Sequence, residues 1–463
     1  MLAVQGCASS PPLQTWHTVA LTKEFSAQRT DEIKTFDDYR QLEDELFAEL
    51  DEKIYASTGT GPEYQLVRYS RGSASDPQSR QPDWNRTFEL EAEMPAGGVL
   101  LLHGMSDSPY SLRALGETLS DRDYWVIGLR LPGHGTVPSG LRTINWEDMA
   151  AAVRLAMEHL ATKVGHKPIH IVGYSTGAPL ALDYAISALE KKVSPAPASL
   201  VLISPAIRIH SAAALASWKN SLSAVPGLAG LTWLSVLPEF DPYKYNSFAT
   251  NAADQVHRIT RSVARRIAAR AGSDSGDGMP PILVFKSAVD ATVTTDAVVD
   301  DLLGRLAPDR HELVLFDINR FAAKSTLLIS DPGPMTNRLM AADNLPFTVT
   351  LVGNETPESN AVVARRKKPG AADVSRVAPL HVDWPAGVFS LSHVALPFPP
   401  DDPLYGDSPP EKQEFVFLGR MVLQGERGLL KIPEDWMLRI RYNPFYSYLE
   451  TRTLEWLETA TNK

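Results

Sequence analysis

The five residues from Gly173 to Gly177 read Gly-Tyr-Ser-Thr-Gly, and their neighbours give this pattern its meaning. An apolar, β-branched run, Ile169–Val172, precedes them, and an alanine- and leucine-rich stretch, Ala178–Leu189, follows them. Strand, Gly-x-Ser-x-Gly turn and helix in this order predict a nucleophile elbow, a sharp turn that exposes a serine hydroxyl above a sheet. Ser175 is therefore the predicted nucleophile, and a plain strand-to-helix turn is the alternative.

A serine hydroxyl becomes a good nucleophile only when a histidine accepts its proton and a carboxylate orients that histidine. After such an elbow the chain order is serine, then Asp or Glu, then histidine. Three histidines lie beyond Asp290, and we favour His393, because it follows an apolar strand and precedes a loop. His311 opens a predicted strand and His381 lies ahead of one, so scaffold roles suit both better.

The carboxylate is predicted from its place at the end of a strand. Asp290 stands just past a strongly apolar run, Pro281–Phe285, and we favour it as the acid. Asp317 occupies a similar place one strand later and is the alternative acid. A helix N-cap is the competing role for either residue.

Two backbone N–H groups must stabilise the oxyanion that a serine nucleophile generates. The residue after the nucleophile, Thr176, supplies one of them. The amide of Met105, in the loop after the apolar run Gly98–Leu102, is the candidate for the other. His103 and His134 precede the elbow in the chain, and we interpret both as structural histidines.

A largely parallel sheet is predicted to position these residues, because continuous apolar runs alternate with helical stretches. The predicted core strands are Gly98–Leu102, Trp125–Leu129, Ile169–Val172, Ala198–Ile203, Pro281–Phe285 and Glu312–Phe316, and the predicted helices are Tyr110–Leu119, Trp146–Ala161 and Ala178–Leu189. Two half-buried antiparallel strands, Tyr64–Tyr69 and Arg86–Leu90, are predicted ahead of them. The expected fold class is α/β, with helices on both faces of the sheet.

The chain divides into five predicted segments. These are a residual signal-like segment (1–12), an N-terminal helical extension (13–60), the first part of the core (61–204), a helical cap insertion (205–279) and the second part of the core (280–463), which carries a long insertion at about 319–380. A cap would lie over the carboxyl edge of the sheet, where ligands bind in such folds, and scaffold packing is its alternative. Within the long insertion, the basic run Arg365–Lys368 is interpreted as a solvated loop.

Composition excludes several classes of protein. The chain has 45 basic and 55 acidic residues and a net charge of −10, which argues against nucleic acid or an anionic membrane as a partner held by charge. A single cysteine permits neither an internal disulfide nor a cysteine-based zinc site. The sequence has no His-Glu-x-x-His, Walker loop or dinucleotide fingerprint.

The start of the chain bears on location. Its apolar stub ends in Gly6-Cys7 and continues with small polar residues and prolines, and it resembles the end of a bacterial lipoprotein signal peptide. The resemblance implies that Cys7 is acylated and attaches the protein to the membrane of the cell envelope, and that the six residues before it are the remainder of a longer signal. An incidental cysteine in a cytoplasmic protein is the alternative.

Three motifs together resemble the α/β-hydrolase superfamily: His-Gly-Met-Ser-Asp-Ser-Pro at 103–109, Leu-Pro-Gly-His-Gly at 131–135, and Gly-Tyr-Ser-Thr-Gly at 173–177. The most similar branch is the monoacylglycerol lipase, lysophospholipase and serine aminopeptidase-like group. The resemblance covers roughly residues 97–300 and the strand and loop that bear His393. It implies ester hydrolysis through an acyl-enzyme, without a metal or an organic cofactor, on acylglycerols, lysolipids or small acyl esters. The alternatives are an aminopeptidase-like amidase and a catalytically silent surface lipoprotein; the oligomeric state is left open.

Overall fold

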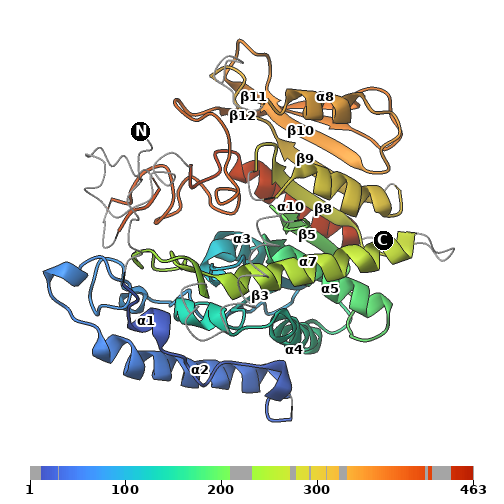
Figure 1. Ribbon diagram of the computed structural model, residues 1–463. Helices are drawn as coiled ribbons and strands as arrows, with labels where there is room; N and C mark the ends of the chain where they lie inside the picture. The colour runs from blue at the N-terminus through green and yellow to red at the C-terminus, as the bar shows by residue number, and fades with distance from the viewer. Residues whose placement is uncertain are drawn as a thin grey trace, which may run out of the picture.

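The apolar runs of the sequence form the strands of one ten-stranded sheet in the computed structural model (Figure 1). The structure describes residues 12–29, 31–208, 232–271, 278–290, 293–308, 310–322, 331–411, 416–419 and 440–461. The sheet has the order β1-β3-β2-β4-β5-β8-β9-β10-β11-β12. Its strands are β1 (Phe88–Leu90), β2 (Gly97–Leu102), β3 (Tyr124–Leu129), β4 (Ile169–Tyr174), β5 (Ser199–Ile203), β8 (Ile282–Ser287), β9 (His311–Phe316), β10 (Thr348–Asn354), β11 (Ala361–Lys367) and β12 (Arg376–Asp383). From β3 to β10 all neighbours pair in parallel, whereas β1 and β11 run antiparallel to the strands beside them.

Helices cover both faces of this sheet, as expected for the α/β class (Figure 1). They are α1 (Thr15–Thr18), α2 (Phe36–Lys53), α3 (Arg113–Ser120), α4 (Trp146–Val164), α5 (Gly177–Leu189), α7 (Thr250–Ala271), α8 (Gly333–Ala341) and α10 (Tyr446–Thr461), with the short helices η1 (Ala27–Arg29), η2 (Tyr55–Ser57), η3 (Pro62–Tyr64), η4 (Pro77–Ser79), η5 (Pro109–Leu112), η6 (Pro138–Arg142), η8 (Ala297–Leu302) and η9 (Leu303–Arg305). Alternate side chains of a strand point to opposite faces, so each strand contributes to two cores. In β2, Leu100 and Leu102 pack with α4, α5 and α7, whereas Val99 and Leu101 pack with α3 and α10.

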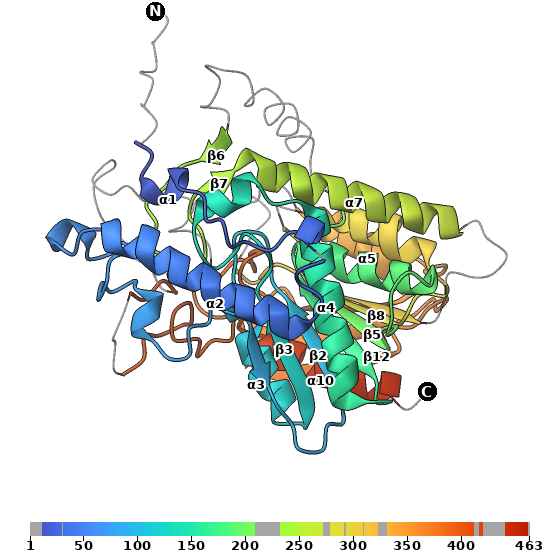
Figure 2. The same cartoon turned by 90° about the horizontal axis from the view of Figure 1, so that it is seen from below.

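The N-terminal extension contains the helix that its apolar stripe predicts. Thr35 caps α2 by accepting the N–H of Asp38, whose carboxylate accepts the N–H of Thr35 in return, which is a capping box. The stripe of Leu42, Leu46, Phe47 and Leu50 is buried. Figure 2 shows one end of α2 meeting α4 at an angle, so the extension packs onto the core through one apolar face.

A buried ion pair joins α2 to the core strands. The Glu43 carboxylate accepts hydrogen bonds from the N–H and the hydroxyl of Thr87, both at 2.8 Å, and from Nε of Arg130 at 2.9 Å. Arg130 is 1% exposed, and its guanidinium also binds Glu24. The extension therefore completes the hydrogen bonding of a charged group at the end of β3.

Replacing Glu43 by alanine is expected to lower the free energy of unfolding by about 3 kcal/mol, because Arg130 loses a buried carboxylate partner. Urea denaturation followed by circular dichroism measures the change. The matched control is Asp44→Ala, since the Asp44 side chain is 77% exposed and binds Arg86 at the surface. The control should change the free energy by less than about 1 kcal/mol, and equal effects of the two variants would contradict the prediction.

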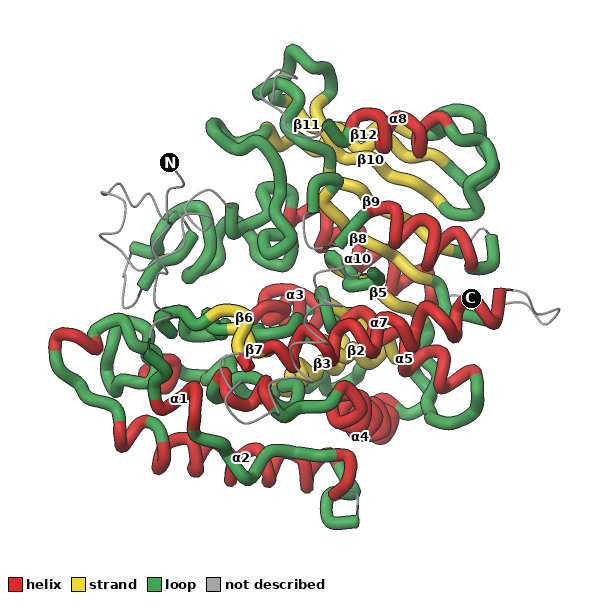
Figure 3. Tube along the Cα trace, in the orientation of Figure 1, coloured by secondary structure: helices red, strands yellow, loops and turns green. Residues whose placement is uncertain are grey.

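The long insertion extends the sheet at one edge. It contributes α8, β10, β11 and β12, and Figure 3 shows these strands at the end of the sheet far from β3. The chain leaves the core at Asn319 and returns beside it. The N–H of Asn319 donates to the carbonyl of Phe389 at 2.8 Å, and its side-chain amide donates to the carbonyl of Val388 at 2.9 Å. The insertion thus begins and ends at one point, at the carboxyl end of β9.

The prediction of a solvated loop at Arg365–Lys368 is wrong, because most of this run lies in β11. The Arg366 guanidinium binds the buried carboxylate of Glu312 in β9 at 2.8 Å. The Lys367 ammonium is also buried and donates to the carbonyl of Met340 at 2.9 Å, at the C-terminal end of α8. These two charges stabilise the insertion from within, so a polar sequence here is compatible with a strand.

The cap predicted for residues 205–279 falls partly outside the described residues, which omit 209–231 and 272–277. The described part contains β6 (Trp233–Ser235), β7 (Phe248–Ala249) and α7. Helix α7 buries Val256, Ile259 and Val263 in the core that it shares with α4 and α5. It connects β5 to β8, so this part of the segment has the scaffold role that was the alternative to a cap.

The strand predicted over Tyr64–Tyr69 is wrong, because this stretch consists of the end of η3 followed by turns. The guanidinium of Arg68 donates to the carbonyl of Asp241 at 3.1 Å. The hydroxyl of Tyr69 donates to the carbonyl of Thr136 at 3.0 Å. Both side chains are buried through these separate contacts, so the alternating pattern does not arise from a pleat.

The membrane predictions concern the start of the chain. The segment with Cys7 lies outside the described residues, so its acylation stays a prediction. No helix in the described ranges combines the length and the apolar character needed to cross a bilayer.

Candidate active site

The elbow places Ser175 on a turn between β4, which ends at Tyr174, and α5, which begins at Gly177. Ser175 has a φ of 51°, in the left-handed region that non-glycine residues rarely adopt. A Cβ at Gly173 would lie 2.6 Å from the backbone of Gly177, and a Cβ at Gly177 would lie 2.1 Å from the carbonyl oxygen of Leu102. Only glycine fits at either flanking position, as the sequence pattern predicts.

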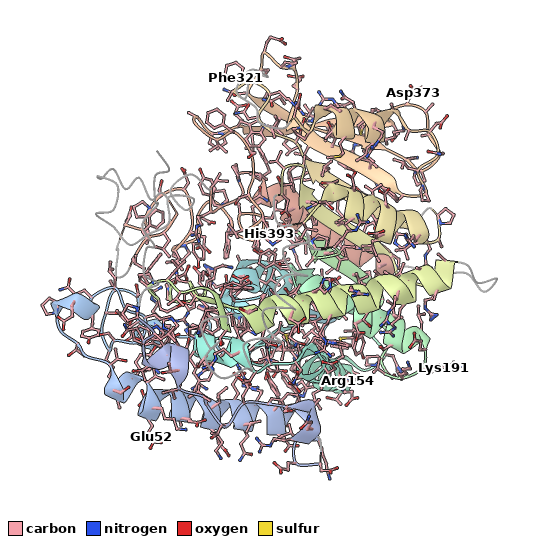
Figure 4. All side chains as sticks on the ribbon, in the orientation of Figure 1. Glu52, Arg154, Lys191, Phe321, Asp373 and His393 are labelled. Carbon is pink, nitrogen blue, oxygen red and sulfur yellow. The ribbon has the colours of Figure 1, made fainter. Side chains whose placement is uncertain are left out.

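The structure brings together the three side chains predicted from the chain order. Nε2 of His393 lies 3.0 Å from Oγ of Ser175, and Nδ1 of His393 lies 2.8 Å from Oδ2 of Asp290. His393 is 8% exposed and the Asp290 side chain is fully buried, whereas Ser175 is only partly buried. Figure 4 shows His393 near the middle of the molecule. With Nδ1–H donated to the carboxylate, Nε2 is the nitrogen free to accept the serine proton.

Hydrogen bonds at His393 and at the two residues before it hold this part of the chain in place, and two of them come from the carboxyl ends of β5 and β8. The hydroxyl of Ser204, just after β5, donates to the carbonyl of His393 at 3.3 Å. The hydroxyl of Ser287, the last residue of β8, donates to the carbonyl of Leu391 at 2.8 Å. The hydroxyl of Ser392 donates to the carbonyl of Ile440 at 2.7 Å. The histidine is therefore anchored independently of the insertion that precedes it.

A buried lysine, Lys286, completes the surroundings of Asp290 and was not predicted. Its Nζ lies 2.9 Å from Oδ2 of Asp290 and donates to the carbonyl of Val293 at 2.6 Å. Burial alone would raise the pKa of Asp290, but the charges and hydrogen bonds of His393 and Lys286 outweigh burial and hold that pKa well below its usual range. Asp290 is therefore an ionised carboxylate. The available signal was a lysine inside a strongly apolar strand, four residues before the predicted acid.

The alternative acid and bases have other roles. Both carboxylate oxygens of Asp317 bind the guanidinium of Arg320, each at 2.9 Å. His311 lies within β9 and accepts the N–H of Ile282 at 3.2 Å. His381 lies exposed on β12, at the outer edge of the sheet. None of the three takes part in the hydrogen bonds between Ser175, His393 and Asp290.

One predicted oxyanion donor lies next to Ser175 in the chain, and the other lies in a loop that packs against Ser175. Thr176 follows it directly, and the loop that carries Met105 comes so close that a Cβ on Gly104 would lie 3.1 Å from Cβ of Ser175. Across the described ranges, neither the N–H of Met105 nor that of Thr176 donates to a protein acceptor. Both amides are thus available to a ligand oxygen.

Residues just before α7 hold the loop that carries Met105, here called the oxyanion loop. Sequence reasoning missed these contacts. Lys244 binds the carboxylate of Asp107 at 2.5 Å, and the N–H of Tyr245 donates to the carbonyl of Ser106 at 2.8 Å. Ser106 has a φ of 67°, a strained conformation for a residue with a side chain. The ion pair joins residues far apart in the sequence, so no local pattern indicated it.

The interpretation of His103 and His134 as structural agrees with their contacts. His103 donates from Nδ1 to the carbonyl of Gly104 at 2.8 Å and accepts the N–H of Leu131 at Nε2, at 3.1 Å. His134 donates from Nδ1 to the carbonyl of Pro132 at 2.9 Å. Burial lowers the pKa of His103 well below its usual value and that of His134 to about 4, so both rings are neutral at pH 7. His103 joins the oxyanion loop to the loop after β3 through its bond to Leu131, and the His134 ring packs against the His103 ring.

This arrangement has the parts that nucleophilic acyl transfer requires: a serine, a histidine at its hydroxyl, an ionised carboxylate behind the histidine, and the amides of Thr176 and Met105, which have no protein acceptor within the described ranges. Within the described ranges, no cluster of three or more His, Cys, Asp and Glu side chains is placed to hold a metal ion.

The order in which the three site residues follow the strands of the sheet identifies the fold. The nucleophile follows β4, the carboxylate follows β8, and the histidine comes after β9 and its insertion, in a parallel sheet with an antiparallel first strand. The chain has the α/β-hydrolase fold. Residues 93–316 match the serine aminopeptidase family, S33.

Parts of the chain are similar to known proteins. A thermostable monoacylglycerol lipase from Bacillus sp. (strain H-257) is 34% identical over 94 residues, which are 20% of this chain. The match spans 37% of the length of that curated relative. Among solved structures, metagenome-derived lipolytic enzymes (TM-score 0.41, 21% identity) and a monoacylglycerol lipase of Paleococcus ferrophilus (TM-score 0.39, 17% identity) are similar to this chain. Each similarity covers 50% of this chain, and 87% and 88% of the other chain respectively.

Proposed function

We propose that this α/β-hydrolase is a serine hydrolase that cleaves carboxylic esters of acylglycerols, lysolipids or small acyl groups. The observation that carries the proposal is the pair of contacts made by His393, with Nε2 at 3.0 Å from Oγ of Ser175 and Nδ1 at 2.8 Å from the Asp290 carboxylate. The similarity to a monoacylglycerol lipase supports esters as the substrate class.

In the proposed acylation step, Nε2 of His393 takes the hydroxyl proton of Ser175 while Oγ attacks the ester carbonyl carbon. The carbonyl oxygen becomes an oxyanion, which the N–H groups of Met105 and Thr176 stabilise. Asp290 holds the imidazolium that forms, because it accepts the hydrogen bond from Nδ1. The tetrahedral intermediate collapses, the ester C–O bond breaks, and Nε2 returns its proton to the leaving alcohol.

In deacylation, a water molecule takes the place of the alcohol. His393 accepts a proton from this water as the water oxygen attacks the acyl carbon bonded to Oγ of Ser175. The same two amides stabilise the second oxyanion. Collapse breaks the bond from the acyl carbon to Oγ, Nε2 returns the proton to Oγ, and a carboxylic acid leaves.

The test compares substrate classes with the full chain. We expect the protein to hydrolyse monoacylglycerols and p-nitrophenyl esters. Aminoacyl p-nitroanilides, whose amide bonds an aminopeptidase-like enzyme would cleave, should be hydrolysed at least about 100-fold more slowly. Rates for a series of esters that differ in acyl chain length identify the preferred acyl chain length. A fluorophosphonate probe should label one serine, identified by peptide mapping as Ser175. Faster cleavage of the anilides would replace the esterase with an amidase, and a folded protein that neither labels nor hydrolyses would be a binding protein.

A further inference from the structure

Lys286 is a buried charged group that binds Asp290 and has no part in the proposed mechanism. It lies in β8, between the buried side chains of Phe285 and Ser287, and its side chain is fully buried. Placing an ammonium group in a core strand is unfavourable unless a counter-charge faces it. The carboxylate of Asp290 supplies that counter-charge at 2.9 Å, and the carbonyl of Val293 supplies a second acceptor.

The lysine and the catalytic histidine bind the same oxygen. Lys286 Nζ lies 2.9 Å from Oδ2 of Asp290, and His393 Nδ1 lies 2.8 Å from that oxygen, while Oδ1 accepts the N–H of Val293 at 3.1 Å. Two donors on one oxygen place the ammonium about 5 Å from the imidazole. Before the reaction, one carboxylate balances one ammonium. When His393 takes a proton, a second positive charge appears beside the first, and the two repel.

Charged groups on the neighbouring loops have partners of their own. Asp107 binds Lys244, and Asp317 binds Arg320. The buried guanidinium of Arg441 lies over the Tyr405 ring, and its charge acts on the Asp241 carboxylate. The Tyr174 ring lies 5.8 Å from the His393 ring. Lys286 differs from all of these because it is bound directly to the carboxylate that holds the histidine.

We propose that Lys286 is a positioning residue that fixes the Asp290 carboxylate and opposes protonation of His393, which extends hydrolysis to mildly acidic pH. This inference rests on the proposed esterase function. As a consequence, the acidic limb of the pH profile of kcat/KM lies at lower pH than it would without Lys286. The reason is that the base must be neutral to accept the serine proton. Burial lowers the pKa of Lys286 itself, but the Asp290 charge acts in the opposite direction and favours the ammonium form.

The test is the acidic limb of kcat/KM for a p-nitrophenyl ester, measured from pH 4.5 to 8 with the full chain. Lys286→Gln retains an N–H donor for Asp290 and removes the charge, so its acidic limb should move upward by about one to two pH units. The matched control is Lys367→Gln, since Lys367 is a buried lysine in the insertion. The control should leave the limb in place, even where it lowers stability.

Three results would overturn the inference: a Lys286→Gln limb that overlays the wild-type limb, one that moves to lower pH, or an equal shift in Lys367→Gln. Circular dichroism at each pH verifies that the variants are folded. If Lys286→Gln does not fold, Lys286→Met, which also removes the charge, is measured in its place. Its acidic limb should move upward in the same way, and a Lys286→Met limb that overlays the wild-type limb would contradict the inference. A wild-type protein with no ester hydrolysis at any pH would refute the esterase function instead.

Discussion

Replacing Ser175 by alanine is expected to lower kcat for ester hydrolysis by about 10⁵-fold or more and to abolish labelling by a fluorophosphonate. The reason is that Oγ attacks the carbonyl carbon in the proposed mechanism, and the observed contacts of the His393 ring include no other hydroxyl group. The residual rate comes from the amides of Met105 and Thr176, which still stabilise an oxyanion formed by attack of water. KM should change much less than kcat, since the substitution removes a single oxygen atom.

A buried serine away from the nucleophile provides the control. Ser111 is 3% exposed in η5, and its hydroxyl donates to the carbonyl of Ser108 at 3.1 Å. Ser111→Ala should keep kcat within about threefold of the wild-type value, because it changes no group that touches the reacting atoms. More than 1% of wild-type activity in Ser175→Ala, with contaminating hydrolases excluded by probe labelling, would assign the chemistry to another residue.

The core of the fold could be predicted because its signals are local. A strand covered on both faces needs an unbroken apolar run, and β2 and β3 follow such runs to within one residue of the predicted bounds. The elbow is local too, since the steric limits at Gly173 and Gly177 arise within a single turn and the strand beside it. Patterns of this kind depend on few long-range contacts, so the sequence displays them directly.

The position of His393 depends on a contact that no local pattern reveals. The chain order and the apolar strand before it favour this histidine, but the long insertion separates it from Asp290 in the sequence. The insertion closes on itself where Asn319 bonds to the carbonyls of Val388 and Phe389. The segment that leads to His393 therefore starts beside the carboxyl end of β9, at the point where the insertion also begins.

The errors and omissions share one physical cause, which is the pairing of polar groups that hydrophobic periodicity does not reveal. Arg366 belongs to a strand because Glu312 in β9 neutralises its charge. Lys286 is tolerated in the core because Asp290 faces it, and Lys244 supports the oxyanion loop through Asp107. None of these residues stands out in the sequence by itself. Composition and periodicity therefore either predicted that the residue is exposed to solvent or gave no signal for it.

Replacing Asp290 by asparagine is expected to lower kcat by about 10⁴-fold while KM stays nearly constant. An amide group facing Nδ1 can donate a hydrogen bond to it, which leaves the proton on Nε2 and prevents that nitrogen from accepting the serine proton. An amide oxygen facing Nδ1 would retain the tautomer but not the negative charge that supports the imidazolium. Stability should also fall by about 3 kcal/mol, because Lys286 remains buried without its counter-charge. Steady-state kinetics and urea denaturation separate the two effects.

Asp317→Asn is the matched control, since Asp317 was the competing candidate for the acid and stands at the end of the next strand. Its carboxylate binds Arg320, whose side chain is 23% exposed, so the substitution should lower stability by no more than about 1 kcal/mol. The value of kcat should stay within about threefold of wild type, because the hydrogen bond from His393 goes to Asp290. A loss of activity in Asp317→Asn equal to that in Asp290→Asn would mean that the histidine changes its carboxylate partner during turnover. A loss in Asp317→Asn alone would move the acid to the end of β9, directly before the insertion.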